Sequence, residues 1–211
     1  SNKLSGVVPQ ISLILGDCIG TSALIAMASD IIVMQKDARL GLETDGKDSD
    51  SDFVANNGLC HIVTDSVQES INMVRDIFYM LPSNNLSDSI ICDTIDCAGI
   101  GDHINKIFDK NTFIEFQKEF GQAFKIGLAR LFGRTVGVIY SFGEKIDSNS
   151  CSKASRMIRF CDSFSIPIIS FINSDGFESL KDASKLSSSY SESTTVKISV
   201  ITKNAYGALY I

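Results

Sequence analysis

Two stretches of this 211-residue chain combine residue types and spacing that suit the binding of an anion. Residues 9–23 read PQISLILGDCIGTSA and residues 196–210 read VKISVITKNAYGALY, so that ISLI aligns with ISVI and Gly20 aligns with Gly207. Each copy has an apolar run, a polar turn and small residues around one glycine, which predicts a buried strand that leads into the first turn of a helix. A chance match between two common strand–glycine turns is the alternative interpretation.

The chemistry of such a turn comes from the backbone. N–H groups at the start of a helix have no partner within the helix and lie at the positive end of its dipole. A glycine at this place lets an anion, or an oxyanion that develops during a reaction, approach closely. The sequence therefore predicts two sets of donors, one near Gly20 and one near Gly207.

The overall composition limits the class of protein. Hydrophobic residues make up 44% of the chain, which is enough for a substantial core, and the formal net charge of −6 argues against a nucleic-acid partner. No apolar run reaches the roughly 18 residues that a membrane span needs, and the first residues do not resemble a secretory leader. We expect a cytoplasmic protein that binds neither membranes nor nucleic acid.

The cysteines and acidic residues do not form a clear metal motif. The six cysteines, at positions 18, 60, 92, 97, 151 and 161, are scattered and have apolar neighbours, which favours reduced, mostly buried thiols. Cys92, Cys97 and His103 lack the spacing of a zinc site. The aspartates between 45 and 52 partly resemble a calcium loop but lack its glycine and its distant glutamate. We expect no metal.

Apolar runs and helical periodicities alternate along the chain and predict an α/β fold with parallel units. We expect a boundary between two halves in the polar stretch 83–103, which gives domains at 1–95 and 96–211. Residues 43–57 are expected to form a loop. Strands are expected at 9–15, 30–34, 38–42, 58–63, 125–129, 136–140 and 166–172, and helices at 20–29, 67–81, 104–108, 150–164 and 181–193.

The expected helices have distinct apolar faces. The helix at 67–81 repeats apolar residues at Val67, Ile71, Val74, Phe78 and Leu81, with Asp65 or Ser66 as its cap. In the helix at 150–164, one face is apolar, with Ala154, Met157, Ile158 and Cys161, and the opposite face carries Lys153 and Arg156.

Five separated motifs resemble the carboxyltransferase subunits of biotin-dependent acyl-CoA carboxylases, with propionyl-CoA carboxylase beta chains as the nearest members. The resemblance runs through nearly the whole chain in the right order. The motifs are residues 6–12 (GVVPQIS), 16–20 (GDCIG), 127–137 (GLARLFGRTVG), 159–167 (RFCDSFSIP) and 200–207 (VITKNAYG).

The resemblance implies two crotonase-like lobes in one chain and transfer of CO2 from carboxybiotin to the α-carbon of a short acyl-CoA. Backbone N–H groups at Gly20 and Thr21 then stabilise the thioester enolate, and those at Ala208 and Leu209 stabilise the biotin urea oxygen. Substrate contacts are implied at Cys18, Ile19, Gly207, Tyr210 and Ile211. The implied partners are further copies of the chain, with an active site between opposite lobes, and subunits that carry or carboxylate biotin.

The chain also departs from the family pattern. The family pairs two glycines in the first turn, where this chain has Gly20 and Thr21, and in the second turn, where it has Gly207 and Ala208. Asp175 replaces a proline before Gly176 and Phe177. The chain enters the first lobe midway and ends before the expected last helix. We therefore expect a fragment, or residues joined across missing loops, with seams at 43–52 and 177–186.

These departures keep other functions open. The main alternative is a divergent, non-catalytic partner subunit of a carboxylase or decarboxylase assembly, because each added Cβ narrows access to the backbone donors. A hydratase or isomerase of the crotonase type would need a base, and Glu43 and Glu144 are the candidates. His61 is expected to be a hydrogen-bonded core residue, and His103 a capping or exposed one.

Overall fold

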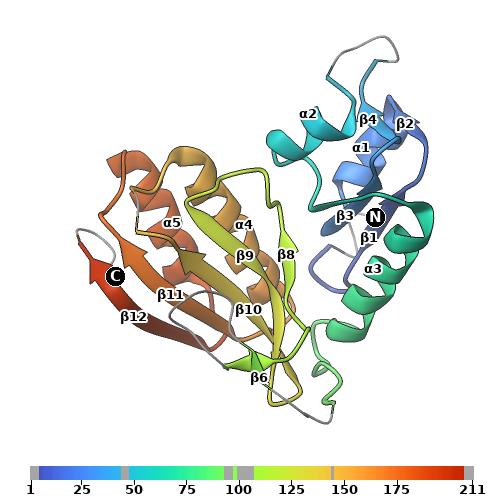
Figure 1. The fold of residues 1–211 in the computed structure, drawn as a ribbon. Coiled ribbons are helices and arrows are strands. Elements are labelled where there is room, and N and C mark those ends of the chain that lie inside the picture. The colour runs from blue at the N-terminus through green and yellow to red at the C-terminus, as the bar shows by residue number, and fades with distance from the viewer. Residues whose placement is uncertain (1–4, 44–47, 93–96, 99–106, 144, 207–211) are drawn as a thin grey trace.

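The computed structural model describes residues 5–43, 48–92, 97–98, 107–143 and 145–206. Within these ranges the chain forms an α/β fold with two larger sheets (Figure 1). One sheet has the strand order β1-β3-β5 and the other has the order β12-β11-β10-β9-β8. Residues 93–96 lie outside the described ranges, so the division into 1–95 and 96–211 stays a prediction.

The first half builds the three-stranded parallel sheet. All three strands run in the same direction, and β3 is buried along its whole length because both neighbours pair with it. The strands β2 and β4 form a separate parallel pair beside it. The elements are β1 (Ile11–Ile14), β2 (Asp17–Ile19), α1 (Thr21–Met27), β3 (Ile31–Gln35), β4 (Arg39–Gly41), α2 (Ser51–Asn56), β5 (Ile62–Thr64) and α3 (Val67–Met80).

The second half builds the five-stranded sheet, which mixes two kinds of pairing. The strands β8, β9 and β10 are antiparallel, and β10, β11 and β12 are parallel. The strands expected at 125–129 and 136–140 are confirmed and form a hairpin, whose turn between Leu131 and Arg134 is predicted from Gly133 and has that residue at a φ of 75°. The elements are β6 (Cys97–Ala98), β7 (Phe108–Asp109), β8 (Ile114–Phe116), β9 (Phe124–Leu131), β10 (Arg134–Ser141), α4 (Ser148–Ser163), β11 (Ile168–Ser174), α5 (Leu180–Glu192) and β12 (Lys197–Ala205).

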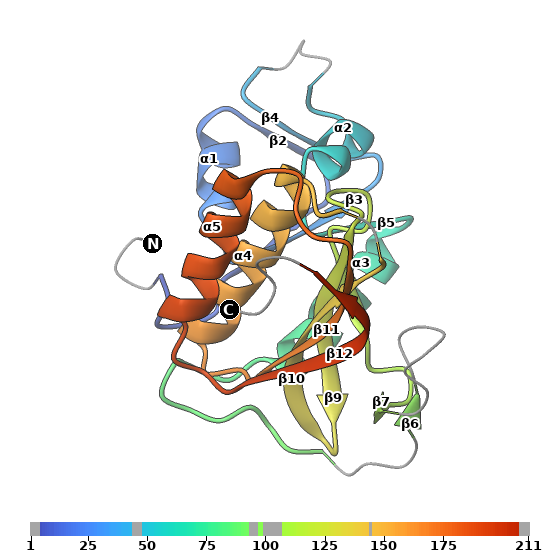
Figure 2. The same ribbon diagram turned by 90° about the vertical axis from the view of Figure 1, so that its left-hand side faces the viewer.

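Figure 2 shows α4 and α5 side by side on one face of the five-stranded sheet. The helix α4 also joins the two sheets, because Ile158 and Cys161 belong to the same buried cluster as Ile31 and Val33 of β3 and Ile77 of α3. One continuous core therefore holds the halves together. Burial of apolar surface in it stabilises the fold by about 25 cal/mol for each Å² removed from water.

Several predicted elements were wrong in kind or in extent. The expected loop at 43–57 contains α2, which Asp50 caps by accepting the N–H of Phe53. The expected strand at 58–63 starts only at Ile62, and Phe108, expected in a helix, lies in β7. Residues 104–106 of that expected helix and His103 are outside the described ranges. Short polar segments carry too little periodicity to show these boundaries.

The helix α3 forms as predicted with Ser66 as its cap, but its orientation differs. The predicted apolar face is partly solvent-facing, with Val67 at 47% and Phe78 at 68% exposure. Ile77 and Met80 are buried instead, against the sheet. The helix is therefore rotated relative to the prediction. Packing against the sheet, and not the most regular apolar spacing, decides which face of α3 is buried.

Lys153 was expected on the face of α4 opposite its apolar residues, and it is buried there, with 1% exposure. Its ammonium donates hydrogen bonds of 2.8 Å to the carbonyl oxygens of Gln117 and Phe120, which lie between β8 and β9, and of Phe124 at the start of β9. Burial lowers the pKa of Lys153 to about 8, while the three carbonyl bonds favour the charged form. Arg156, on the same face, is half-buried, and burial lowers its pKa.

Candidate functional site

The first strand–glycine–helix element forms in the place where the sequence predicts it. After β1, the chain makes the short strand β2, turns at Gly20 and enters α1 at Thr21. Gly20 is the N-cap residue, with φ 68° and ψ −127°, a backbone conformation that residues with a Cβ rarely adopt. The polar turn is thus partly a strand, in which Cys18 pairs with Leu40 and Ile19 with Gly41.

The Gly20 N–H already has a partner, because it donates to the carbonyl oxygen of Gly41 at 2.9 Å. The first N–H groups of α1, starting with Thr21, lie beyond this bond and have no partner within the helix. The Thr21 side chain is exposed. The element therefore presents the Thr21 amide, whereas the Gly20 amide holds the turn against β4.

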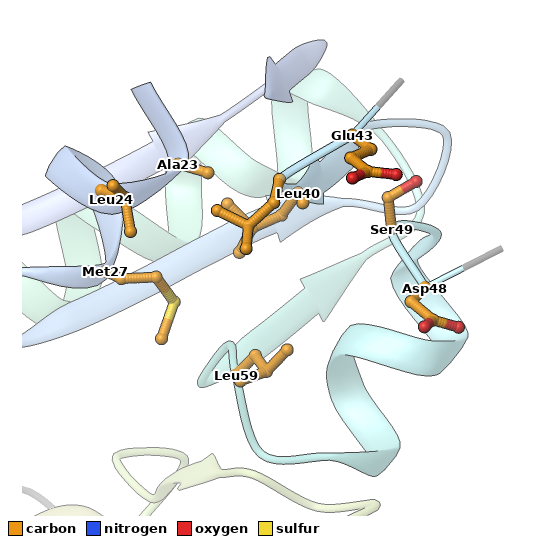
Figure 3. A pocket seen from close by; sticks show the side chains of 10 residues that line it. Ala23, Leu24, Met27, Leu40, Glu43, Asp48, Ser49 and Leu59 are labelled. Atoms are coloured by element: carbon orange, nitrogen blue, oxygen red, sulfur yellow. The ribbon is translucent and has the colours of Figure 1, made fainter. Parts of the chain in front are cut away.

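A pocket of about 460 Å³ lies beside this turn, between α1, β4 and the segment before β5 (Figure 3). Its walls are mainly aliphatic, which suits an apolar group. Among the described residues that line the pocket, the ionisable side chains are the carboxylates of Glu43 and Asp48. The lining residues are Ala23, Leu24, Met27, Leu40, Gly41, Leu42, Glu43, Asp48, Ser49 and Leu59.

Sequence reasoning found the turn but missed most of this pocket. Leu24 and Met27 were assigned only to a small-residue helix, and Leu59 to a strand. Leu24, Met27 and Leu59 lie near the glycine turn in space, and no local sequence pattern predicts that proximity. Glu43, a candidate base for the hydratase alternative, does line the pocket, whereas Glu144 lies outside the described ranges.

The second copy of the element is described only in part. Its strand β12 pairs in parallel with β11 and forms the edge of the five-stranded sheet. The residues Thr202–Asn204, expected to turn, still belong to this strand. Gly207, Ala208, Leu209, Tyr210 and Ile211 lie outside the described ranges, so their expected roles stay predictions.

His61 is a core residue, as expected, and not a catalytic base. Its Nδ1 accepts the backbone N–H of Ile32 at 3.0 Å, and its ring packs edge-on against Phe116 at a centroid distance of 5.8 Å. Burial, with a smaller contribution from the nearby Arg156 charge, lowers the pKa of His61 to about 3. The imidazole is therefore neutral at pH 7 and its acceptor nitrogen is occupied.

The buried cysteines are poor nucleophiles. Burial raises the pKa of Cys60 to about 11 and that of Cys151 to about 12, and it also raises the pKa of Cys161. The cysteines described with their side chains are free thiols, of which Cys92 is exposed and Cys18 half-buried. Among the described residues, no three His, Cys, Asp or Glu side chains gather where they could hold a metal ion.

The described helices include none that is both long and apolar enough to cross a membrane. The paired sheets, the covering helices and the glycine turn at a strand end are those of a crotonase-like α/β protein. A crystal structure of the transcarboxylase 12S subunit, with hydrolysed methylmalonyl-coenzyme A bound, superposes with a TM-score of 0.88 and 25% identity, over 99% of this chain and 50% of that one. The expected fold class is confirmed.

The carboxyl transferase domain family matches residues 50–211, and the chain belongs to that family. It is 28% identical to the propionyl-CoA carboxylase carboxyltransferase subunit of Haloferax mediterranei, over 100% of this chain and 50% of that protein. It is 29% identical to the methylmalonyl-CoA decarboxylase alpha subunit of Veillonella parvula, over 100% of this chain and 51% of that protein. The resemblance to carboxyltransferase subunits is thereby confirmed.

The chain spans about half the length of the curated relatives that it matches. Its 211 residues align over 257 positions with the Haloferax protein, so that relative carries segments without a counterpart here. The acidic connection around residues 43–52 and the region 177–186 are the places where the sequence predicts such differences.

Proposed function

We propose that this chain provides the acyl-CoA side of a carboxyltransferase, which moves a carboxyl group between carboxybiotin and the α-carbon of a short acyl-CoA such as acetyl- or propionyl-CoA. The observation that carries the proposal is the α1 start at Gly20 and Thr21 beside an apolar pocket of about 460 Å³. Family membership and the names of the relatives support the same reaction class.

The proposed role of the turn is electrostatic. When a proton leaves the α-carbon of a thioester, negative charge develops on the thioester oxygen. A fixed N–H donor at this oxygen is worth several kcal/mol, because it needs no reorganisation during the reaction. In this proposal the Thr21 N–H is the donor. The backbone conformation of Gly20 turns that N–H outward. Cys18 and Ile19 hold the turn through the β2–β4 pairing.

The second half is proposed to hold the biotin side. Carboxybiotin, when bound, supplies the activated carboxyl group, and the amides of Ala208 and Leu209 are the proposed donors to the urea oxygen. Gly207, Tyr210 and Ile211 are the proposed contacts around them. A homo-oligomer with sites between opposite lobes, together with biotin-carrying and biotin-carboxylating subunits, is the proposed assembly.

A non-catalytic partner subunit is the second candidate, and one observation favours it. The Gly20 N–H donates to the Gly41 carbonyl oxygen, so of the two amides expected as donors in the first turn only that of Thr21 remains for a ligand. The Thr21 side chain also narrows the approach to its own amide. In this candidate the chain keeps the fold for assembly and binds acyl-CoA weakly or not at all.

The two candidates are separated by titrating the full-length natural protein with acetyl-CoA and propionyl-CoA by calorimetry. Saturable binding supports the enzyme, and no binding of either ligand supports the partner subunit. A Leu59→Trp variant, which fills the pocket, should abolish that binding. Leu180→Trp is the matched control, because Leu180 is 84% exposed and lies on α5.

A further inference from the structure

A small cavity lies where the two halves of the chain meet. It has about 20 Å³ of space for the centre of a water molecule, and one water needs roughly 10–15 Å³ by this measure. Apolar side chains form part of its wall. The polar side chains that line it come from both halves, Asp30 and His61 from the first and Gln117 and Arg156 from the second. The cavity is therefore large enough for a single water and polar enough to hold one.

Gln117 contributes a hydrogen-bond acceptor without a donor. The residue is 4% exposed, and its Nε2 donates to the Gly58 carbonyl oxygen at 2.7 Å, which sets the orientation of the side-chain amide. Its Oε1 has no hydrogen-bond partner in the part of the chain that the structure describes. Buried polar atoms nearly always have a partner, either a protein group or an ordered water. The partner of this oxygen is therefore expected to be a water.

His61 contributes a donor without an acceptor. Its Nδ1 accepts the N–H of Ile32, so in the neutral ring the proton is on Nε2. Within the described ranges, no group accepts a hydrogen bond from this Nε2–H. The imidazole thus has one nitrogen tied to the first sheet and one available to a molecule in the cavity.

Asp30 and Arg156 contribute opposite charges that do not touch. Asp30 Oδ2 accepts the N–H of Gln10 at 2.8 Å, and the carboxylate keeps further acceptor capacity. Burial raises the pKa of Asp30, and the Gln10 N–H and the Arg156 charge act against this rise. Yet no hydrogen bond or ion pair joins Arg156 to Asp30 among the residues that the structure describes. A water between two such groups lets them interact nearly as well as a direct bond would.

We propose that this cavity is the binding site of one ordered water molecule, which bridges the two halves of the chain. A water donates two hydrogen bonds and accepts two. The cavity offers two acceptors, Gln117 Oε1 and the Asp30 carboxylate, and two donors, the His61 Nε2–H and the Arg156 guanidinium. One water therefore satisfies all four groups. This site is independent of the proposed function, because it depends only on the contact between the halves.

The direct test is a crystal structure of the full-length natural protein at a resolution that shows ordered water. We expect one density peak at roughly 2.6–3.2 Å from Gln117 Oε1 and from at least two of the other three groups. The absence of a peak in contact with Gln117 Oε1, or a direct bond between Arg156 and Asp30 that closes the cavity, would overturn the proposal. This test needs no variant that has to fold.

A double-mutant cycle tests whether the water couples the halves. Gln117→Met and Arg156→Met each remove one partner of the same water, so their effects on the unfolding equilibrium constant should be smaller together than the product of the single effects, by about fivefold. The matched control pairs Gln117→Met with Arg159→Met, because Arg159 is exposed on the same helix. The effects of the control pair should multiply. Urea unfolding measures both cycles, and a Gln117–Arg156 pair that behaves like the control pair would overturn the bridging role.

Discussion

The Nδ1 atom of His61 accepts the backbone N–H of Ile32 at 3.0 Å, and this bond ties the segment before β5 to the centre of the first sheet. The same segment reaches the second half, since the His61 carbonyl oxygen accepts the N–H of Gln117 at 2.7 Å. A neutral imidazole is required, because a protonated Nδ1 cannot accept a hydrogen bond. The fold is therefore coupled to pH at this residue.

We expect acid to destabilise the fold through His61. Its pKa is about 3 when folded and near 6.5 when unfolded, so the unfolded state binds more protons between these values. The free energy of unfolding should thus fall by about 1.4 kcal/mol for each pH unit below 6.5, until pH 3 is approached.

Urea unfolding measured between pH 7 and pH 5 checks this expectation, because most carboxylates stay ionised in that range. The His61→Asn variant keeps an acceptor for the Ile32 N–H and does not titrate. Its stability should be nearly flat over the same range, and an equal slope in the variant and the wild type would exclude His61 as the cause.

Lys153 provides a second prediction, on stability. Lys153→Met removes the donor for three backbone carbonyl groups in the 117–124 segment, and we expect a loss of about 2–4 kcal/mol. Lys181→Met, at an exposed position on α5, should change stability by less than about 0.5 kcal/mol. Thermal unfolding of both variants is the measurement, and equal midpoints would contradict a structural role for the buried ammonium.

A third prediction concerns two glycines. A Cβ at Gly127 in β9 would overlap the Ile114 carbonyl oxygen of the neighbouring strand β8, whereas a Cβ at Gly16 would meet nothing within 4 Å. Gly127→Ala should therefore destabilise by about 3 kcal/mol or more, and Gly16→Ala should be close to neutral. Comparable denaturation midpoints for the two variants would mean that β8 moves away from β9 freely.

The fourth prediction addresses catalysis. If the missing glycine pairs limit the rate, then Thr21→Gly/Ala208→Gly should raise the transfer of carboxyl label from methylmalonyl-CoA to free biotin by tenfold or more. Thr21→Ser keeps a Cβ and should behave as the wild type. Circular dichroism controls for the loss of helix stability, about 1 kcal/mol for a glycine in α1. A measurable rate that the double variant leaves unchanged would refute the access argument, whereas no transfer by either protein would support the non-catalytic candidate.

The sequence by itself determined the strand–glycine–helix turn at Gly20, the capped helix after Ser66 and the hairpin at Gly133. These features depend on local chemistry, namely a positive φ, a side-chain cap and an apolar run, so a single stretch carries the whole signal. The family resemblance belongs to the same category, because its motifs are read along the chain.

Only the tertiary structure decided which side chains are buried and what surrounds the turn. The sequence places Lys153 on the face of its helix opposite the apolar residues, and the side chain is buried because three carbonyl groups from a segment about 30 residues away accept hydrogen bonds from its ammonium. Phe78 fits an apolar face and is exposed because the sheet contacts Ile77 and Met80 instead. The pocket likewise brings Leu59 to Leu24. Burial is a property of packing between distant segments, and no local periodicity specifies it.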